Sequence, residues 1–216
     1  MTPRVGTFCA CATDVVVGAD RITLWQVADL EAHVDRGALL RGGDAPEPPY
    51  WAHLWSGARL LAAAVPARAG RVLELGCGLG LPALVAARRG AEVLATDREM
   101  APLAFVRASA RANGLATLRV AAMDLRDAAV ARRFDLVLLA EVLYDRSAFA
   151  PLVQSLDRVL APGGEVLITD GRRIDTAEFY GRLEAAGFAW AAAEFVTTEE
   201  GFPVRIRLAR IRRSGR

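Results

Sequence analysis

The chain of 216 residues contains no lysine, and all 27 of its basic residues are arginines. These arginines nearly balance 25 acidic residues and leave a formal net charge of +2. Because affinity for nucleic acid rests on an excess of basic side chains, this balance gives no electrostatic case for a nucleic-acid partner. Asparagine is scarce as well and occurs once, as Asn113, whereas alanine, glycine and arginine are abundant. Together these features indicate a GC-rich genome.

Cysteine and long apolar runs are also scarce. The three cysteines, Cys9, Cys11 and Cys77, are too few for a disulfide framework, which favours a reducing, cytoplasmic location. No second Cys or His pair completes a metal site with Cys9 and Cys11, so we expect no metal. Residues 1–20 hold no apolar core of signal-peptide length, and no apolar run approaches a membrane span. We therefore expect neither a leader nor a membrane partner.

The residues that are present suffice for a folded core. Hydrophobic residues make up 53% of the chain and charged residues 24%, a composition that excludes extensive disorder. The length fits one domain with a short appendage. A cluster of prolines at positions 46, 48 and 49 forms the connector between the two parts. We therefore predict an N-terminal appendage over residues 1–45 and a main domain over residues 46–216.

The appendage does not show the alternation of a βα repeat. Asp14–Val17 and Arg21–Val27 predict a short hairpin around the turn Gly18-Ala19-Asp20. Asp29–Leu40 predicts a brief helix. After the connector, the apolar spacing of Trp51–Val65 predicts a helix that Pro66 ends.

From residue 71 onward, short apolar runs alternate with longer amphipathic segments. The runs that predict strands are Arg71–Leu75, Glu92–Thr96, Thr117–Ala121, Phe134–Ala140, Gly164–Thr169, Trp190–Val196 and Val204–Arg210. The segments that predict helices are Leu81–Arg89, Ala101–Asn113, Ala128–Arg132, Ala148–Leu160 and Thr176–Ala186. Strands separated by helices require right-handed crossovers and a parallel sheet covered on both faces. The last two strands are joined by Gly201-Phe202-Pro203 without a helix, so an antiparallel edge hairpin is predicted.

A glycine-rich turn follows the first of these strands, in the run Glu74-Leu75-Gly76-Cys77-Gly78-Leu79-Gly80-Leu81. Glycines at such a strand-to-helix turn let the backbone approach a ligand closely. A dinucleotide fingerprint requires its third glycine at position 81, which is Leu81. The acidic Glu74 before the G-x-G-x-G spacing suits a ligand with a cationic amino-acid portion. The alternative is a tight turn that binds no ligand.

An aspartate follows each of the next two predicted strands. Asp97 lies at the carboxyl tip of the second strand, where its carboxylate is placed to accept hydrogen bonds from both ribose hydroxyls of an adenosine. Asp124 follows the third strand, where it and the neighbouring amides can meet the adenine amino edge. For both residues the structural alternative is the cap of a following helix.

The ordered set of Glu74, G-x-G-x-G, Asp97, Asp124 and the strand Phe134–Ala140 before Glu141 resembles the class I S-adenosylmethionine-dependent methyltransferases. The resemblance covers roughly residues 50–210. It implies an α/β fold with a Rossmann-like seven-stranded sheet of order 3-2-1-4-5-7-6 and an antiparallel last strand. It also implies S-adenosyl-L-methionine as cofactor and S-adenosyl-L-homocysteine as product. The cofactor-binding residues it implies are Trp55, Glu74, Gly76, Cys77, Gly78, Gly80, Asp97, Arg98, Asp124, Leu125 and Glu141.

Two further stretches narrow the resemblance. Residues 48–61, Pro-Pro-Tyr-Trp-Ala-His-Leu-Trp-Ser-Gly-Ala-Arg-Leu-Leu, look like the segment preceding the domain in the electron-transfer-flavoprotein β-subunit lysine methyltransferases and the nicotinamide N-methylase-like proteins. Glu141-Val142-Leu143-Tyr144 resembles the D-x-x-Y motif of the same group, with Glu in place of Asp. Thr169-Asp170-Gly171-Arg172 resembles a further short motif of that group. The resemblance implies Glu141 and Tyr144 as the catalytic pair that binds an amine acceptor.

The function predicted from these residues is a cytoplasmic S-adenosylmethionine-dependent N-methyltransferase that methylates lysine in a protein by direct in-line transfer. Two alternatives stay open: a small-molecule N-methyltransferase whose partner is a metabolite amine, and a catalytically silent cofactor-binding scaffold. His53 is interpreted as a hydrogen-bonded structural residue, and Phe202 as an exposed aromatic at the hairpin tip. Short edge strands and the modest net charge favour a monomer.

Overall fold

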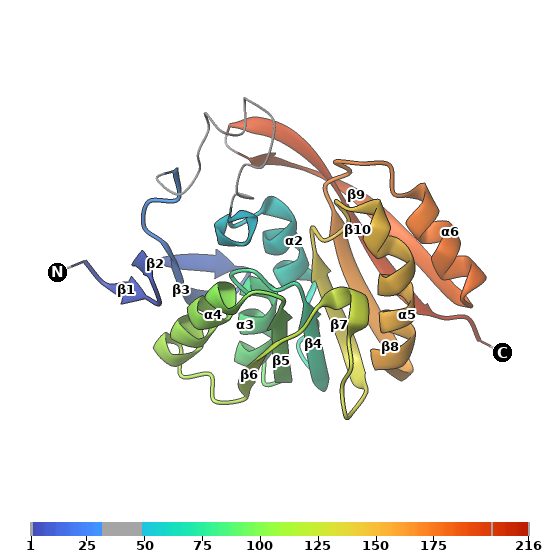
Figure 1. Cartoon of the computed structure of the whole chain (residues 1–216), viewed down its shortest axis with the longest axis horizontal. Helices are drawn as coiled ribbons and strands as arrows, with labels where there is room; N and C mark the ends of the chain where they lie inside the picture. The colour runs from blue at the N-terminus through green and yellow to red at the C-terminus, as the bar shows by residue number, and fades with distance from the viewer. Residues whose placement is uncertain (1, 32–48, 200, 216) are drawn as a thin grey trace.

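A seven-stranded mixed sheet forms the centre of the protein in a computed structural model that describes residues 2–31, 49–199 and 201–215 (Figure 1). Its strands in chain order are β4 (Arg71–Leu75), β5 (Glu92–Asp97), β6 (Leu118–Ala122), β7 (Phe134–Ala140), β8 (Leu160–Asp170), β9 (Phe188–Glu199) and β10 (Phe202–Arg213). They lie in the order β6-β5-β4-β7-β8-β10-β9, and β10 runs antiparallel to both β8 and β9. The predicted order and the reversed last strand are confirmed.

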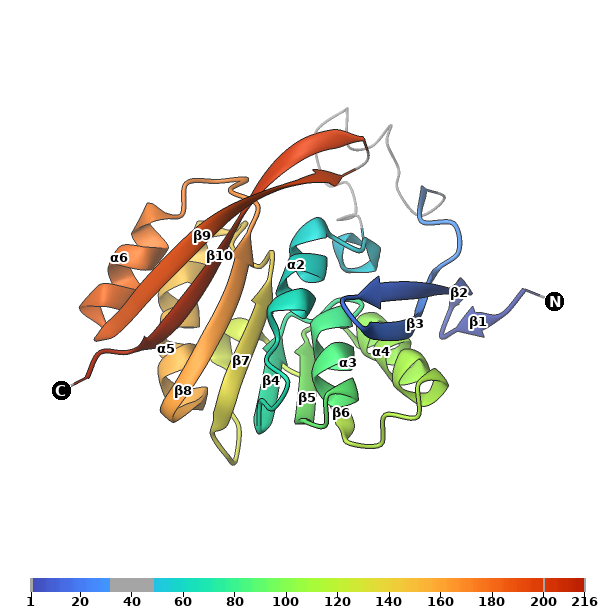
Figure 2. The same cartoon turned by 180° about the vertical axis from the view of Figure 1, so that it is seen from behind.

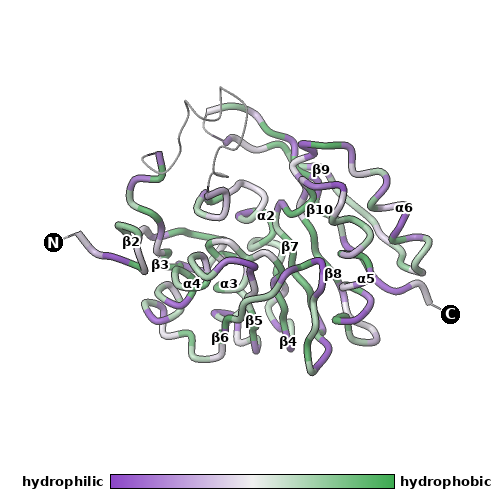
Figure 3. The backbone as a smooth tube through the Cα atoms, viewed as in Figure 1, coloured by the Kyte–Doolittle hydropathy of each residue, from purple (hydrophilic) through white to green (hydrophobic). Residues whose placement is uncertain are grey.

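Helices cover both faces of this sheet. On one face lie α2 (Ser56–Ala64), α3 (Leu81–Arg88) and α4 (Met100–Ala112), seen in front of the strands in Figure 2. On the other face lie α5 (Phe149–Val159) and α6 (Ala177–Ala185), which are in front in Figure 1. Because successive side chains of a strand point to opposite faces, Val72 enters the first core and Leu73 the second. The central strands are therefore apolar on both sides and mainly green in Figure 3.

A second, three-stranded sheet contains the predicted hairpin. It is formed by β1 (Arg4–Val5), β2 (Phe8–Val17) and β3 (Asp20–Val27), with β2 and β3 joined through Gly18 and Ala19. The outer edge of β3 is covered by α4: the Asn113 side chain accepts from Thr23 N at 3.0 Å and donates to Thr23 O at 2.7 Å. The side chain of Asn113 thus makes the two backbone hydrogen bonds that a neighbouring strand would make with Thr23. Most of the predicted helix Asp29–Leu40 lies outside the described residues, and the boundary at residue 45 stays a prediction.

The prediction of one helix over Trp51–Val65 is wrong. A 3-10 turn, η2 (Tyr50–Ala52), is followed by extended backbone at residues 53–55 before α2 begins at Ser56. The apolar residues before and after the extended segment pack against different parts of the protein, and this explains why a single helix does not form. Trp51 packs against Phe8 and Phe105, with ring centroids 5.4 and 5.5 Å away, whereas α2 packs on the sheet.

The predicted helix Ala128–Arg132 is also wrong. Asp124 accepts from Arg126 N at 2.8 Å, so the chain turns three positions earlier, at Leu125, and forms a 3-10 turn, η3 (Leu125–Asp127). Ala128 N then donates to Ser155 Oγ of α5 at 3.0 Å instead of continuing a helix. Five alanine-rich residues are too few to overcome the cost of helix nucleation without tertiary support.

Among the described residues no helix is long and apolar enough to cross a membrane.

Candidate active site

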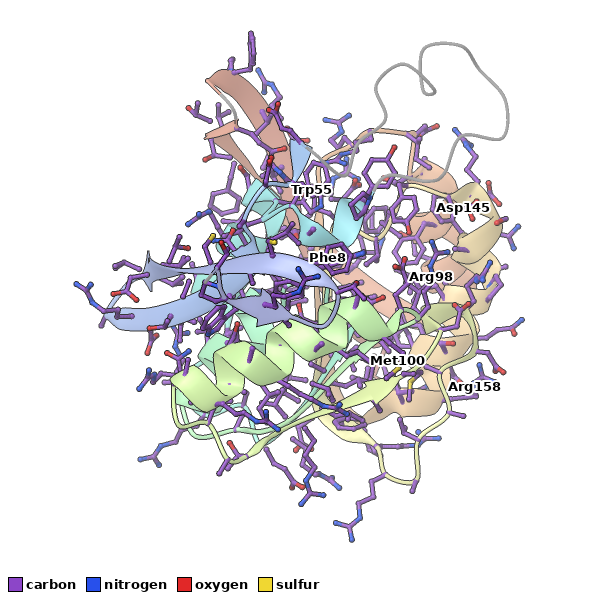
Figure 4. The ribbon with its side chains drawn as sticks, turned by 60° about the vertical axis from the view of Figure 1, so that its left-hand side comes forward. Phe8, Trp55, Arg98, Met100, Asp145 and Arg158 are labelled. Atoms are coloured by element: carbon purple, nitrogen blue, oxygen red, sulfur yellow. The ribbon has the colours of Figure 1, made fainter. Side chains whose placement is uncertain are left out.

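A cleft of about 860 Å³, counted out to its open mouth, lies at the carboxyl ends of β4, β5 and β7. The residues before α2 form one wall, and the turns after the three strands form its floor and opposite wall. Trp55, which precedes α2, and Arg98, which follows β5, both line the cleft and can be located in Figure 4. The cleft brings together ten of the twelve predicted site residues: Trp55, Gly76, Cys77, Gly78, Gly80, Asp97, Arg98, Leu125, Glu141 and Tyr144.

The glycine-rich turn after β4 has a backbone conformation that favours glycine. Gly78 and Gly80 have φ values of +50° and +69°, in the left-handed region. A Cβ on Gly78 would lie 3.0 Å from Trp51 O, and a Cβ on Gly80 would lie 2.7 Å from Val106 Cγ2. Substitution at either position therefore combines backbone strain with a steric conflict. The turn presents bare backbone to the cleft, which is what a closely bound ligand requires.

Glu74 lies behind this turn rather than on the wall of the cleft. Its carboxylate is fully buried, and Oε2 accepts from Ala83 N of α3 at 2.9 Å. Oε1 has no hydrogen-bond partner among the described residues. Burial raises the pKa of Glu74 to about 8. Glu74 therefore fixes α3 against the glycine turn, and its direct contact with a cofactor stays a prediction.

Asp97 lines the cleft and also supports the backbone around it. Oδ2 accepts from Gly78 N at 3.0 Å, and Oδ1 accepts from Glu99 N at 3.1 Å. Burial raises the pKa of this carboxyl, and the two backbone hydrogen bonds act in the opposite direction. The N-cap residue of α4 is Glu99, without a side-chain cap, so Asp97 supports the turn before the helix and does not cap it. A ribose contact of Asp97 stays a prediction.

Asp124 lies in an adjoining pocket that shares Arg98, Leu125 and Tyr144 with the cleft. Its carboxylate caps η3 and pairs with the Arg126 guanidinium, with Nη2 and Oδ2 2.6 Å apart. Hydrogen bonding from Arg126 lowers the pKa of Asp124. The capping interpretation is confirmed, and an adenine contact through this pocket stays a prediction.

Glu141, directly after β7, is held from several sides. Its φ of +56° is unusual for a residue with a Cβ, and its N–H donates to Thr169 O at 3.0 Å. Oε2 accepts from Gly171 N at 2.9 Å, and the side chain is only 6% exposed. The carboxylate is pressed against Gly57 of α2, where a Cβ would overlap Oε1 and lie 2.7 Å from Cδ. Burial raises the pKa of Glu141.

Tyr144 differs from Glu141 in being 53% exposed, on the border between the cleft and the adjoining pocket. His53 also lines the cleft, with its ring centroid 4.2 Å from that of Trp55. Its Nε2 is 3.9 Å from Glu199 Oε1. The interpretation of His53 as a hydrogen-bonded structural residue stays a prediction.

Two residues at the site were missed from the sequence. The Arg173 guanidinium lies over the Trp55 ring, 3.9 Å from its centroid, and Nη2 is 3.9 Å from Glu141 Oε2. Gly57 makes room for the Glu141 carboxylate. The available signals were a glycine at the start of a helix, and a pair of arginines directly after the strand-tip motif Thr169-Asp170-Gly171.

Residues 73–168 match the model of a methyltransferase domain family. Among curated proteins, the chain is 32% identical over 101 residues to a ubiquinone biosynthesis O-methyltransferase of Acinetobacter baumannii (strain ACICU). That match covers 46% of this chain and 43% of the relative, so the chain spans less than half of that protein. A ubiquinone biosynthesis O-methyltransferase of Pseudomonas aeruginosa (strain LESB58) is 29% identical over 116 residues, 53% of this chain and 50% of the relative.

Solved structures show the same fold. A TehB-like SAM-dependent methyltransferase from Corynebacterium glutamicum superposes with a TM-score of 0.58 at 21% identity and covers 75% of this chain and 89% of its own. The glycopeptide N-methyltransferase MtfA, solved with S-adenosylmethionine, has a TM-score of 0.58 at 20% identity, with 74% and 87% covered.

The sheet order and the glycine turn define a class I methyltransferase fold. Residues 73–168 are similar to a methyltransferase domain family, and the solved S-adenosylmethionine-dependent methyltransferases share the fold of the chain. The bare glycine turn and Asp97 at the tip of β5 fit such a cofactor. The lysine methyltransferase subgroup is not confirmed by these comparisons.

Proposed function

We propose that the chain transfers the methyl group of S-adenosylmethionine to a hydroxyl group of a small molecule. The observation that carries this proposal is the position of Arg173. A lysine acceptor is expected to place its ammonium between an acidic group and an aromatic face. Glu141 and Trp55 are the pair nearest to each other through Arg173, in a cleft that Asp97, Glu99, Tyr50, Trp51 and Tyr144 also line. The Arg173 guanidinium already contacts both.

A second cation at this position would meet a like charge. Two unit charges about 4 Å apart interact with about 4 kcal/mol at the effective dielectric of a protein surface. Arg173 is 43% exposed, so solvent screening reduces this repulsion to a fraction of that value. Even a reduced repulsion disfavours an ammonium, whereas a neutral hydroxyl carries no such penalty. The site therefore disfavours binding of the protonated form in which a lysine arrives, whereas a hydroxyl binds without first losing a proton.

The chain must hold the acceptor oxygen in line with the methyl group and receive its proton. S-adenosylmethionine, when bound, supplies a methyl group on a sulfonium, which is an electrophile without further activation. Glu141 lines the cleft, and burial raises its pKa, which makes its carboxylate a stronger base than an exposed one. A carbon–oxygen bond forms, the carbon–sulfur bond breaks with its electron pair left on sulfur, and the proton passes to Glu141.

The curated relatives support this choice, because both are named for O-methylation in ubiquinone biosynthesis. The second candidate is the N-methylation of protein lysine predicted from the sequence. It is favoured by the placement of Glu141 and Tyr144, the residues of the D-x-x-Y-like motif, at the same cleft. On this second proposal Arg173 moves aside when the lysine binds.

Pairs of small acceptors that carry either a hydroxyl or a primary amine at the same position separate the two candidates. With methyl-labelled S-adenosylmethionine, we expect the hydroxyl member of each productive pair to react at least about tenfold faster, a difference of ~1.4 kcal/mol in activation free energy. A reaction without the chain serves as the background control. Faster methylation of the amine member would refute the assignment of the acceptor and leave the cofactor assignment intact.

A further inference from the structure

The N-terminus of α2, which borders the cleft, receives no cap from its own segment. Trp55 occupies the cap position and makes no side-chain hydrogen bond to the helix. The first backbone N–H groups of a helix lack partners inside it and need an external acceptor. A side chain from a different part of the chain supplies one here.

That acceptor is Glu199, at the end of β9. Its Oε2 accepts from Ser56 N at 2.9 Å, across 143 positions of sequence, and its side chain is 20% exposed. Oε1 is 3.9 Å from Nε2 of His53. In Figures 1 and 2 the far end of the β9–β10 hairpin extends beyond the sheet toward α2. A carboxylate at this end of a helix also interacts favourably with the helix dipole.

The contact of Glu199 is continuous with the wall of the cleft. Ser56 directly follows Trp55, and the Trp55 ring lies against His53 and beneath Arg173. Both Trp55 and His53 line the cleft. A shift of Ser56 would therefore move the ring that forms this wall.

We propose that Glu199 is a positioning residue for the cofactor cleft, and that the β9–β10 hairpin acts through it to hold the Trp55 wall in place. The inference rests on the proposed function only in so far as the cleft binds the cofactor, and it does not depend on the acceptor. It assigns a role in the cofactor site to a hairpin that lies outside the matched methyltransferase domain.

Two substitutions at Glu199 test this role by calorimetry with S-adenosylhomocysteine. Glu199→Ala removes the acceptor and is expected to weaken binding about fivefold, which corresponds to the ~1 kcal/mol typical of a lost helix cap. Glu199→Gln keeps an oxygen acceptor and is expected to stay within about twofold of wild type. Glu178→Gln is the control, because this glutamate pairs with Arg182 on the surface of α6.

A matched pair at Ser56 tests the same hydrogen bond from the donor side. Ser56→Pro removes the N–H at the first helical position, where proline is well tolerated, and the preceding Trp55 has the extended ψ of 144° that proline requires. We expect the same weakening of about fivefold as for Glu199→Ala, with no further loss in the double variant. Ser56→Ala keeps the N–H and should bind as wild type does.

Melting temperature and hydrogen exchange are measured on the same variants. Glu199→Ala and Ser56→Pro variants that melt lower but bind S-adenosylhomocysteine as wild type does would overturn the proposal, because the contact would then be merely structural. If the wild-type chain binds no S-adenosylhomocysteine, the cofactor assignment fails. In that case, amide exchange of residues 53–58 still tests whether Glu199 holds the start of α2. We expect this exchange to be at least about tenfold faster in Glu199→Ala than in wild type. Unchanged exchange would overturn the inference.

Discussion

Gly57→Ala should disable the site although the residue contributes no functional group. The new Cβ would overlap Oε1 of Glu141 and lie 2.7 Å from its Cγ and Cδ. Glu141 cannot simply rotate away, because its N–H is bound to Thr169 O and its Oε2 to Gly171 N. Either the hydrogen bond to Gly171 breaks, or α2 shifts and loses the bond from Thr169 Oγ1 to Gly57 O at 3.1 Å.

The cost follows from these contacts. A hydrogen bond to a charged group contributes about 1.5–3 kcal/mol, and alanine returns about 0.5–1 kcal/mol through its better helix propensity. We therefore expect a net loss of about 1–2 kcal/mol in the free energy of unfolding, or roughly 2–8 °C in melting temperature for a chain of this size. Turnover should fall by about a hundredfold, because a displacement of about 1 Å at a catalytic group has that effect.

Differential scanning calorimetry of a double-mutant cycle checks this reasoning. In a Glu141→Ala background there is no carboxylate to displace, so Gly57→Ala should leave the melting temperature unchanged or raise it. An equal decrease in both backgrounds would show that the carboxylate is not what Gly57 accommodates. Full turnover in the single variant would refute the placement of Glu141 at the reacting centre.

Three further predictions concern charged groups of the site. Asp97→Asn places an amide N–H against the N–H of Gly78 or of Glu99, so S-adenosylhomocysteine should bind about tenfold more weakly in calorimetry; unchanged affinity would contradict the role of Asp97. The pKa of Glu74 is raised from 4.5 to about 8, so the folded state keeps a proton that the unfolded state releases. The free energy of unfolding should therefore decrease as the pH rises from about 4.5 to 8, and urea titrations of Glu74→Gln should show a flatter dependence. Arg173 lowers the pKa of Glu141, so Arg173→Ala should move the acidic limb of the kcat/KM profile to higher pH; a shift to lower pH would exclude Glu141 as the base.

Much of the fold could be predicted because the central strands are buried on both faces. Such strands are continuous apolar runs with sharp ends, and β4 and β7 have the bounds that the sequence predicts. The two helix predictions that were wrong concern segments whose backbone is set by tertiary contacts and not by the local sequence pattern. At residues 53–55 and 128–132 the local pattern favours a helix, but tertiary contacts of Trp51 and a hydrogen bond to Ser155 determine the backbone.

The residues of the candidate site also fall into those that the sequence predicts and those that it does not. Residues that follow a strand tip, such as Asp97 and Glu141, could be predicted because the ends of parallel strands meet at one edge of the sheet. Arg173 and Glu199 could not, because each acts on the segment before α2 from more than a hundred positions away. The arginine pair after Thr169-Asp170-Gly171 marks Arg173 as lying near the strand tip, but no spacing pattern in the sequence shows which distant residue it contacts.

The most direct test of the proposed function is the fate of the methyl group. The purified chain is incubated with methyl-labelled S-adenosylmethionine and a cell lysate, and the products are separated into protein and small molecules. We predict label in the small-molecule fraction, on oxygen, and its loss with Glu141→Gln. Because the chain contains no lysine, methyl-lysine in the protein fraction would come from another protein. Label found there, and none on a small molecule, would contradict the proposed acceptor.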